Sequence, residues 1–105
     1  MGGDAEVFRR ECYVEDEHGA VQPLVVTFHE PAYSAHDAAY RAQANINCAW
    51  FKATVHGVGE DGAQAFFWLP VVVVSYLIGQ RRFGYETYWC EKGDLDCSDF
   101  WTHRR

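Results

Sequence analysis

Apolar and polar residues alternate along the first part of the chain, in residues 5–15 and again in residues 21–29. In the second segment the alternation places Leu24, Val26 and Phe28 on one face. A two-residue period is typical of a half-buried β-strand, because successive side chains of a strand point to opposite faces. The polar segment between them includes Gly19, which can adopt a positive φ. We therefore expect a β-hairpin with a fairly long loop.

Two later segments also predict strands. Residues 45–56 carry apolar side chains at both parities, which is typical of a central strand covered on both faces. Residues 83–91 alternate aromatic and polar side chains and give a fourth strand. Residues 31–44 are rich in alanine but have no dense apolar stripe. They form either a short helix from Ser34 or His36 or an ordered surface loop.

Residues 62–80 contain no Lys, Arg, Asp or Glu, and three interpretations of this run compete. It can form a buried helix, or a central strand in residues 71–74, whose valines favour the pleated surface. It can also form a transmembrane span, since about 20 apolar residues cross a bilayer. Two glutamines, Pro70 and a glycine near each end argue against the span.

We favour the helix because both of its ends carry suitable residues. The Asp61 carboxylate can accept a hydrogen bond from the N–H of Gln64, whose side chain can reach back in return. Gly79 is placed to end the helix. Pro70 deletes one backbone hydrogen bond and clashes with the preceding turn, at a cost of about 3 kcal/mol, so we expect a kink or a break there.

Residues 66–74 are apolar on every face of such a helix. We expect this part to be covered on one side by the sheet and on another by a further segment, a second copy of the chain or a partner. The order strand, strand, strand, helix, strand predicts an α+β fold. In it, one long helix packs on one face of a four-stranded, mostly antiparallel sheet. We expect residues 1–105 to form one domain, with an acidic and aromatic tail at residues 92–105.

This layout resembles a family of small bacterial domains of unknown function. The residues that carry the resemblance are a proline after the second strand, a cysteine and an aromatic residue at the third, a glycine-rich turn, and an acidic residue with Gln-Ala opening the helix: Pro31, Cys48, Phe51, Gly57, Gly59, Asp61, Gln64 and Ala65. The resemblance covers residues 7–89 and implies a fold and a bacterial cytosolic origin, but no activity. The helix departs from the family, whose helices are usually rich in Leu and Ala, in having Pro70 and four valines.

Charge and cysteine content narrow the class of protein. Fifteen acidic residues against nine basic ones give a net charge of −6, which disfavours nucleic acid and anionic membranes as partners. The first ten residues contain no apolar signal core, so we expect a cytoplasmic protein whose four cysteines are reduced thiols. Those cysteines are Cys12, Cys48, Cys90 and Cys97.

No residue spacing indicates a catalytic, cofactor or metal site. Cys90, Cys97 and His103 lie too far apart for the close ligand pairs of a zinc site. The aspartates of the tail lack the glycine and the bidentate glutamate of a calcium loop. Cys48 with His56 or His29 could form a nucleophile and base, but an apolar strand position is more typical of the core. A small Cys/His-dependent hydrolase or metal-binding enzyme is therefore only the alternative.

Our leading hypothesis is a non-enzymatic protein-interaction domain, of an immunity or a regulatory type. It would act either by self-association over the helix and the sheet edge, as a homodimer, or by docking a basic partner on the acidic and aromatic C-terminal face. Tyr and Trp are enriched in interfaces, and opposite charge speeds encounter. The candidate partner-binding residues are Trp89, Asp94, Asp96, Asp99, Phe100 and Trp101.

Overall fold

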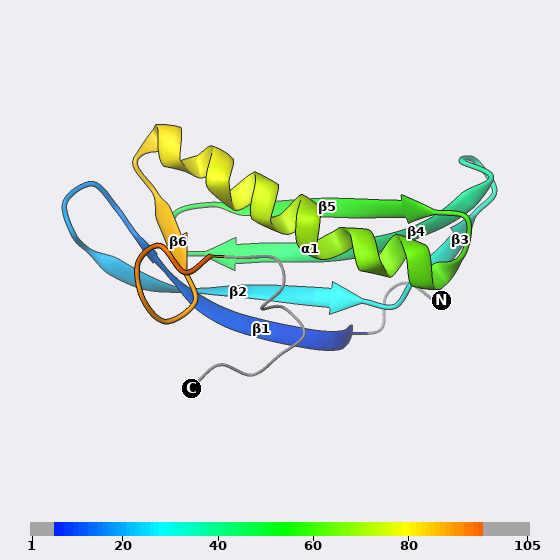
Figure 1. Cartoon of the computed structure of the whole chain (residues 1–105), viewed down its shortest axis with the longest axis horizontal. Helices are drawn as coiled ribbons and strands as arrows, with labels where there is room; N and C mark the ends of the chain where they lie inside the picture. The colour runs from blue at the N-terminus through cyan, green and yellow to red at the C-terminus, as the bar shows by residue number, and fades with distance from the viewer. Residues whose placement is uncertain (1–5, 96–105) are drawn as a thin grey trace.

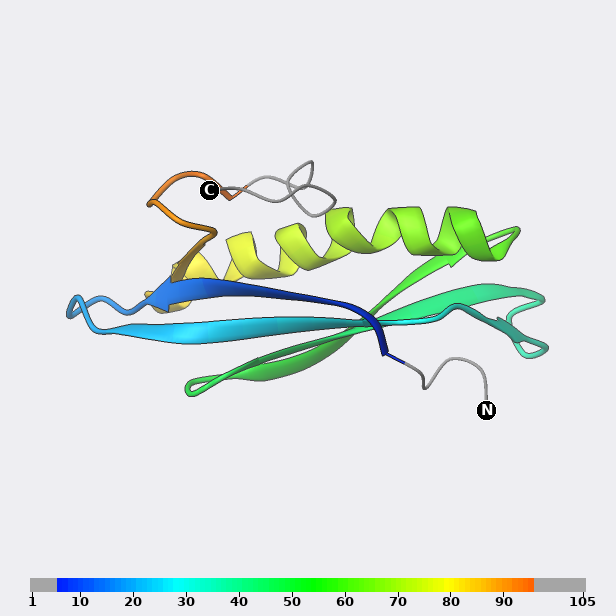
Figure 2. The same ribbon diagram turned by 90° about the horizontal axis from the view of Figure 1, so that it is seen from below.

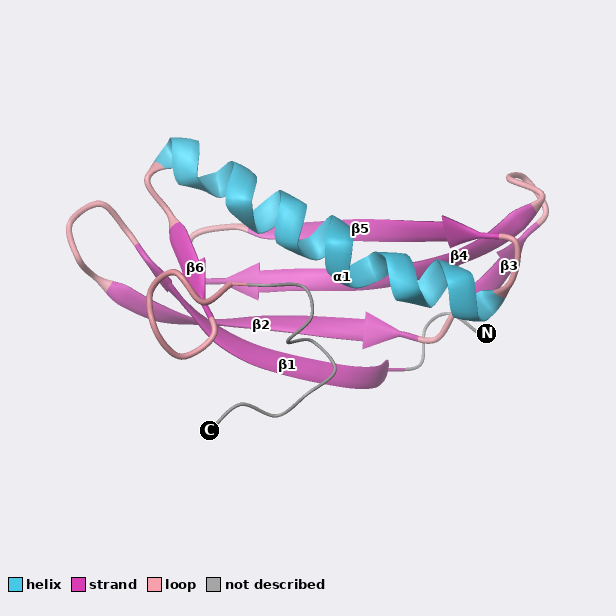
Figure 3. Cartoon of the chain, viewed as in Figure 1, coloured by secondary structure: helices cyan, strands magenta, loops and turns pink. Residues whose placement is uncertain are grey.

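The computed structural model describes residues 6–95, which form six strands, one long helix and one 3-10 turn. In chain order these are β1 (Glu6–Glu15), β2 (Val21–His29), β3 (Ala32–Ser34), β4 (Ala39–Cys48), β5 (Lys52–Gly59), α1 (Gly62–Gly79), η1 (Gln80–Phe83) and β6 (Glu86–Tyr88). The strands form one twisted sheet, and α1 crosses a single face of it (Figures 1 and 3). Seen along the sheet, the helix lies on one side only (Figure 2).

All strand pairs are antiparallel. The order across the sheet is β5, β4, β2, β1 and β6, and β3 pairs with the first residues of β4. Since β5 occupies the other side of β4, the short β3 continues the line of β2. Among residues 6–95, β5 and β1 therefore form the two long borders of the sheet, and β6 covers only the last three residues of β1.

The expectation of an α+β fold with an antiparallel sheet and one long helix is confirmed. The expectation of four strands is wrong. Residues 45–56 are not one central strand but contain the turn that joins β4 to β5. This turn holds Trp50 and Phe51, and the N–H of Cys48 donates to the carbonyl of Phe51 at 3.0 Å. It has none of the Gly, Pro, Asn or Asp residues that usually mark a turn.

Two further segments differ from expectation. Residues 31–44 form neither a helix nor a loop but β3, a turn and the start of β4, with Ala38 at φ 52° in the turn. The last strand is only Glu86–Tyr88, because η1 and Gly84 at φ 90° occupy the residues before it. The second strand has the predicted boundaries.

The helix begins as predicted. The carboxylate of Asp61 accepts a hydrogen bond from the Gln64 N–H at 2.8 Å, and the Gln64 side chain accepts one from the Glu60 N–H at 2.6 Å. The α-helix ends at Gly79, although this residue is right-handed, and the chain continues into η1. The helix is not split at Pro70, which is buried in the core contact. Packing of this kind contributes more to helix stability in proteins than propensity does.

The core lies between α1 and the face of the sheet that it crosses. Alternate residues of β1, β2 and β4 meet one side of the helix, and the buried apolar residues are Cys12, Val14, Leu24, Val26, Phe28, Ala42, Ala44, Ile46, Ala65, Leu69, Val73, Val74, Leu77 and Trp89. Phe66 of the helix contacts Phe28 of β2 at 5.9 Å between ring centroids. The indole of Trp89 closes the end of the core beneath the guanidinium of Arg10, 4.6 Å from the ring centroid.

Candidate docking surface

A row of large apolar side chains lies on the face of α1 that points away from the sheet and, with Trp68, reaches the side of the helix next to β5. Phe67, Trp68, Val71 and Ile78 are exposed by 68%, 51%, 41% and 43%. Their spacing in sequence places them on one side of a helix with 3.6 residues per turn. We call these four residues the α1 stripe. Gln64 and Ser75 are also exposed on this side, and α1 contains no charged residue.

The α1 stripe is comparable in area to the largest apolar patch of a typical monomer. Because a whole aromatic side chain presents about 150–250 Å², the exposed parts of Phe67 and Trp68 alone present roughly 200–300 Å². The largest apolar patch of a typical monomer is about 300–600 Å² and is often functional. The shallow hollow beside these rings is lined by Asp61, Ala63, Gln64, Phe67, Trp68 and Val71.

The stripe is a consequence of the all-round apolar helix that the sequence predicts. The sheet covers the side that carries Leu69 and Val73. Within the described part of the chain, the opposite side of the helix meets no second layer, and the large side chains there stay exposed. The expected cover by the sheet is thus present, and the side that carries the α1 stripe is exposed.

The free border of β5 lies directly beside the stripe. Among the described residues β5 pairs only with β4, so the backbone groups on its other border have no strand partner. A Cβ atom built on Gly57 of β5 would lie 3.2 Å from the Cβ atom of Trp68. The stripe and this border therefore form one continuous surface.

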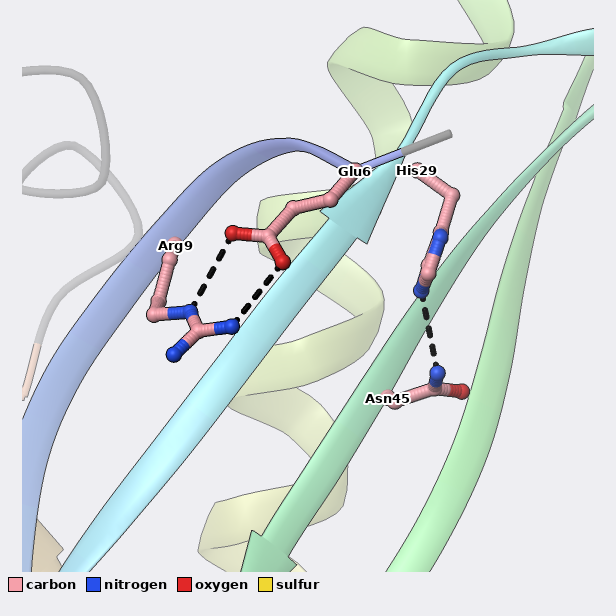
Figure 4. Close-up of polar contacts among 4 residues, drawn as sticks. All are labelled: Glu6, Arg9, His29 and Asn45. Carbon is pink, nitrogen blue, oxygen red and sulfur yellow. Dashed lines mark hydrogen bonds and ion pairs between the residues drawn. The ribbon is translucent and has the colours of Figure 1, made fainter. Parts of the chain in front are cut away.

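The face of the sheet opposite α1 is open and carries a group of hydrogen-bonded polar side chains. Asn45 lies near its centre, where its side-chain oxygen accepts hydrogen bonds from Thr54 at 3.0 Å and Gln43 at 3.3 Å. Its amide nitrogen lies 3.0 Å from Nε2 of His29 (Figure 4). At the border of this face Glu6 and Arg9 form an ion pair of 2.9 Å. A shallow hollow on this face is lined by Asn45, Ile46, Asn47, Lys52, Ala53 and Thr54.

Two of the predicted partner-binding residues lie in the described part of the chain. Trp89 is 2% exposed and belongs to the core. The carboxylate of Asp94 accepts hydrogen bonds from the N–H groups of Trp89, Cys90 and Glu91 at 2.6, 2.8 and 2.9 Å. Both residues thus have a structural role, which the sequence pattern did not indicate. Asp96, Asp99, Phe100 and Trp101 lie outside the described residues.

The structure does not bring together the residues of the alternative enzyme hypothesis. Cys48 packs toward the core, on the α1 side of the sheet. His56 lies opposite Gln43 on the other face, and the register of β2 and β4 places His29 there too. Burial raises the pKa of the Cys12 thiol to about 12, which leaves it without nucleophilic thiolate near neutral pH.

Metal ligands are likewise dispersed. Among residues 6–95, no three His, Cys, Asp or Glu side chains gather where they could hold an ion. Cys97 and His103 lie outside this range. A cleft of about 330 Å³ at the tip of the β1–β2 hairpin collects charged residues of both signs, namely Glu15, Asp16, Glu17, Arg81, Glu86 and Lys92. Lys92 and Glu15 pair there at 3.0 Å, which raises the pKa of Lys92.

Comparison with known proteins gives no relative: no family model, curated protein or solved structure matches the chain. By length and composition the segment Gly62–Phe83 could cross a membrane, and 28% of its most apolar window is buried. One side of α1 packs on the sheet, and the other side carries exposed apolar residues. Its role is therefore inferred from the surface it presents.

Proposed function

We propose that this protein is a non-enzymatic protein-interaction domain that docks its partner on the α1 stripe and the neighbouring border of β5. The observation that supports this function is the exposure of Phe67 and Trp68 on a helix without charges. Aromatic anchors of this type are enriched at the centres of protein interfaces, whereas charged residues are depleted there. A free strand border adds main-chain hydrogen bonds, as in strand-addition complexes.

A protein partner fits this surface better than a small ligand does. The hollow beside Trp68 is shallow and open, and its polar lining residues, Asp61 and Gln64, already accept backbone hydrogen bonds at the start of α1. The surface is instead long, apolar and flanked by a strand. These are features of an extended macromolecular contact.

A basic partner on the acidic C-terminal face is a separate proposal for the same class of function. It now depends on Asp96, Asp99, Phe100 and Trp101, because Trp89 is buried and the carboxylate of Asp94 is bound to backbone N–H groups. Alanine substitution of Trp101, Asp96 and Asp99 would abolish capture of that partner without unfolding the chain. Unchanged capture would rule this proposal out.

Site-specific photo-crosslinking tests the α1 surface. Val71 would be replaced by p-benzoylphenylalanine in the full chain expressed in cells, and adducts would be identified by mass spectrometry. Val7, an exposed valine of β1 at the other border of the sheet, receives the same replacement as a control. We expect protein adducts from position 71 and few from position 7. Adducts with lipid alone, or equal labelling from both positions, would reject this function.

A further inference from the structure

We infer that the occupant of this surface is a second copy of the chain, joined by antiparallel pairing of β5 with β5 of that copy about a two-fold axis at His56. This inference rests on the proposed docking function and names its partner. The sheet would continue across the axis, and the two α1 helices would lie on the same face.

The two borders of the sheet differ in how they are protected. On β1 the part not covered by β6 contains Glu6, Arg9, Arg10 and Glu11, and charged residues on a border strand discourage pairing with another chain. The border of β5 has one fixed charge, Lys52, in the sequence KATVHGVG. In Figure 1, β5 forms one border of the sheet and α1 crosses above it. Of these two borders, β5 is therefore the one suited to strand pairing.

Symmetry restricts the register of this pairing. In an antiparallel pair, residues directly opposite each other face the same side of the sheet. When the two strands are identical and related by a two-fold axis, the residue numbers of each opposite pair must therefore add to the same even number. With His56 on the axis, Ala53 of one copy lies opposite Gly59 of the other, and nearly the whole strand is paired. This register also places Lys52 opposite Glu60 of the second copy, twice by symmetry.

The charges support this register over its neighbours. The side chains of Lys52 and Glu60 are both exposed, so each is available to the other copy. Centring the pair on Val55 would place Lys52 opposite Val58, and centring it on Gly57 would shorten the paired strand. In both neighbouring registers the direct match of opposite charges is lost, and such cross-strand matches contribute to strand pairing.

The position of α1 makes the helices part of the same interface. Because α1 packs mainly on β5 and β4, the two α1 helices of the dimer would lie about two strand spacings apart. That distance is roughly 10 Å, at which helices pack together. Trp68, which stands over Gly57 of β5, would then face the second helix.

The area of the interface also requires both parts. A stable dimer buries about 800 Å² on each partner, which is more than the aromatic part of the α1 stripe exposes. Strand pairing along β5 would supply backbone hydrogen bonds, and Trp68 beside Gly57 would supply apolar contact with the second helix. The aromatic part of the stripe alone does not reach the usual size of a stable interface.

The axis would bring two imidazole rings together. His56 of each copy would face the other on the open side of the sheet, where the nearby groups are Gln43 opposite it on β4 and the charged side chains of Arg41 and Asp37. α1 lies on the other face and carries no charge. Protonation of both rings would add like charges at the axis, so the dimer would weaken as the pH falls.

Charge exchange at the two ends of the paired strand tests the inference. The molar mass of the full chain in solution would be measured by sedimentation equilibrium for the natural sequence, Lys52→Glu, Glu60→Lys and the double variant. We expect two chains per particle for the natural sequence. Each single substitution would raise the dimer Kd at least about tenfold, since like charges then face each other twice, and the double variant would restore it.

Glu11→Lys is the matched control, because it makes the same charge change at an exposed site of β1 at the other border of the sheet. It is expected to leave the dimer Kd unchanged, and circular dichroism would check that each variant folds. A monomeric natural chain, or a dimer unaffected by the single substitutions, would overturn the inference. An adduct from position 71 with a different protein would also overturn it but would leave the proposed docking function intact.

Discussion

A Cβ atom on Gly57 would lie 2.3 Å from the carbonyl oxygen of Ala65, so α1 passes over β5 at backbone contact distance. Gly59 shows the same closeness, with its Cβ position 2.6 Å from the backbone nitrogen of Ala65. Glycine is required here for lack of space, because every side chain begins with a Cβ atom. This contact fixes the height of the helix above the border strand and places Trp68 over the border of the sheet.

Gly57→Ala should therefore be strongly destabilising. The added methyl group meets backbone atoms that cannot move without lifting the helix, so we expect a loss of at least about 2–3 kcal/mol in the free energy of unfolding. Urea unfolding followed by circular dichroism measures this. Gly79→Ala is the control: its Cβ position has nothing within 4 Å and its backbone is helical. It should stabilise the protein by up to about 1 kcal/mol. Equal effects of the two substitutions would contradict the close approach.

Local signals in the sequence are sufficient to predict the first hairpin and the start of the helix. In residues 21–29 apolar side chains recur at every second position, and this pattern indicates a strand with one buried face. The cap of Asp61 and Gln64 is a short-range interaction that depends on few neighbours. Both features were confirmed, the cap with the small difference that the Gln64 side chain bonds to Glu60.

The turn between β4 and β5 could not be read from the sequence, because its residues carry the opposite signal. Trp50 stacks on Tyr85 at 5.4 Å, and Phe51 contacts both Tyr85 and Tyr76. The turn is thus stabilised by packing against segments distant in the chain, which a local pattern does not show. Its aromatic residues instead extended the apparent strand, and the prediction of one central strand followed.

The same limit applies to the candidate surface. The sequence predicts that the helix needs cover on more than one side, but not which residues remain open, since this depends on where the sheet packs. The free border of β5 was missed because its residues were assigned to a central strand. Asp94 was assigned to a partner face, and its hydrogen bonds to the N–H groups of Trp89, Cys90 and Glu91 were not predicted.

The three backbone hydrogen bonds to the Asp94 carboxylate lead to a second prediction, for Asp94→Asn. Both carboxylate oxygens of Asp94 accept backbone hydrogen bonds, so an amide NH₂ in place of one oxygen would face an N–H donor. We expect a loss of about 1–2 kcal/mol and a red shift of tryptophan fluorescence as the loop around Trp89 loosens.

Asp16→Asn is the control for this substitution. Asp16 accepts its two bonds, from the N–H groups of His18 and Ala20, on a single oxygen that asparagine retains. Its effect should stay within about 0.5 kcal/mol. If Asp94→Asn changes the free energy of unfolding equally little, the three hydrogen bonds to Asp94 do not contribute to stability.

A third prediction concerns thiol reactivity. Cys90 is exposed and Cys12 is buried, and burial raises the pKa of Cys12 to about 12. Because the thiolate is the reactive form, iodoacetamide at neutral pH should modify Cys90 in the native protein and Cys12 only after unfolding. Peptide mapping by mass spectrometry separates the two sites. Rapid native modification of Cys12 would contradict the burial of this thiol.

His56 provides the prediction of pH dependence. Burial on the sheet, and then the charge of Arg41, lower the pKa of His56 below its ordinary value of 6.5, against a smaller opposing effect of Asp37. The unfolded chain therefore binds a proton at a pH where folded His56 does not. By linkage, stability falls as the pH drops through 6.5 toward the folded pKa, and is fully regained above 6.5.

His56→Gln removes this titration and keeps a polar side chain in the row beside Gln43. The free energy of unfolding of the natural chain and the variant would be compared between pH 5 and pH 7.5 at one protein concentration, chosen so that both are monomeric by sedimentation. We expect a steeper loss of stability for the natural chain on acidification. The difference between the two pH profiles isolates His56 from the other titrating groups. Parallel profiles would mean that the imidazole is as well hydrated in the folded state as in the unfolded chain.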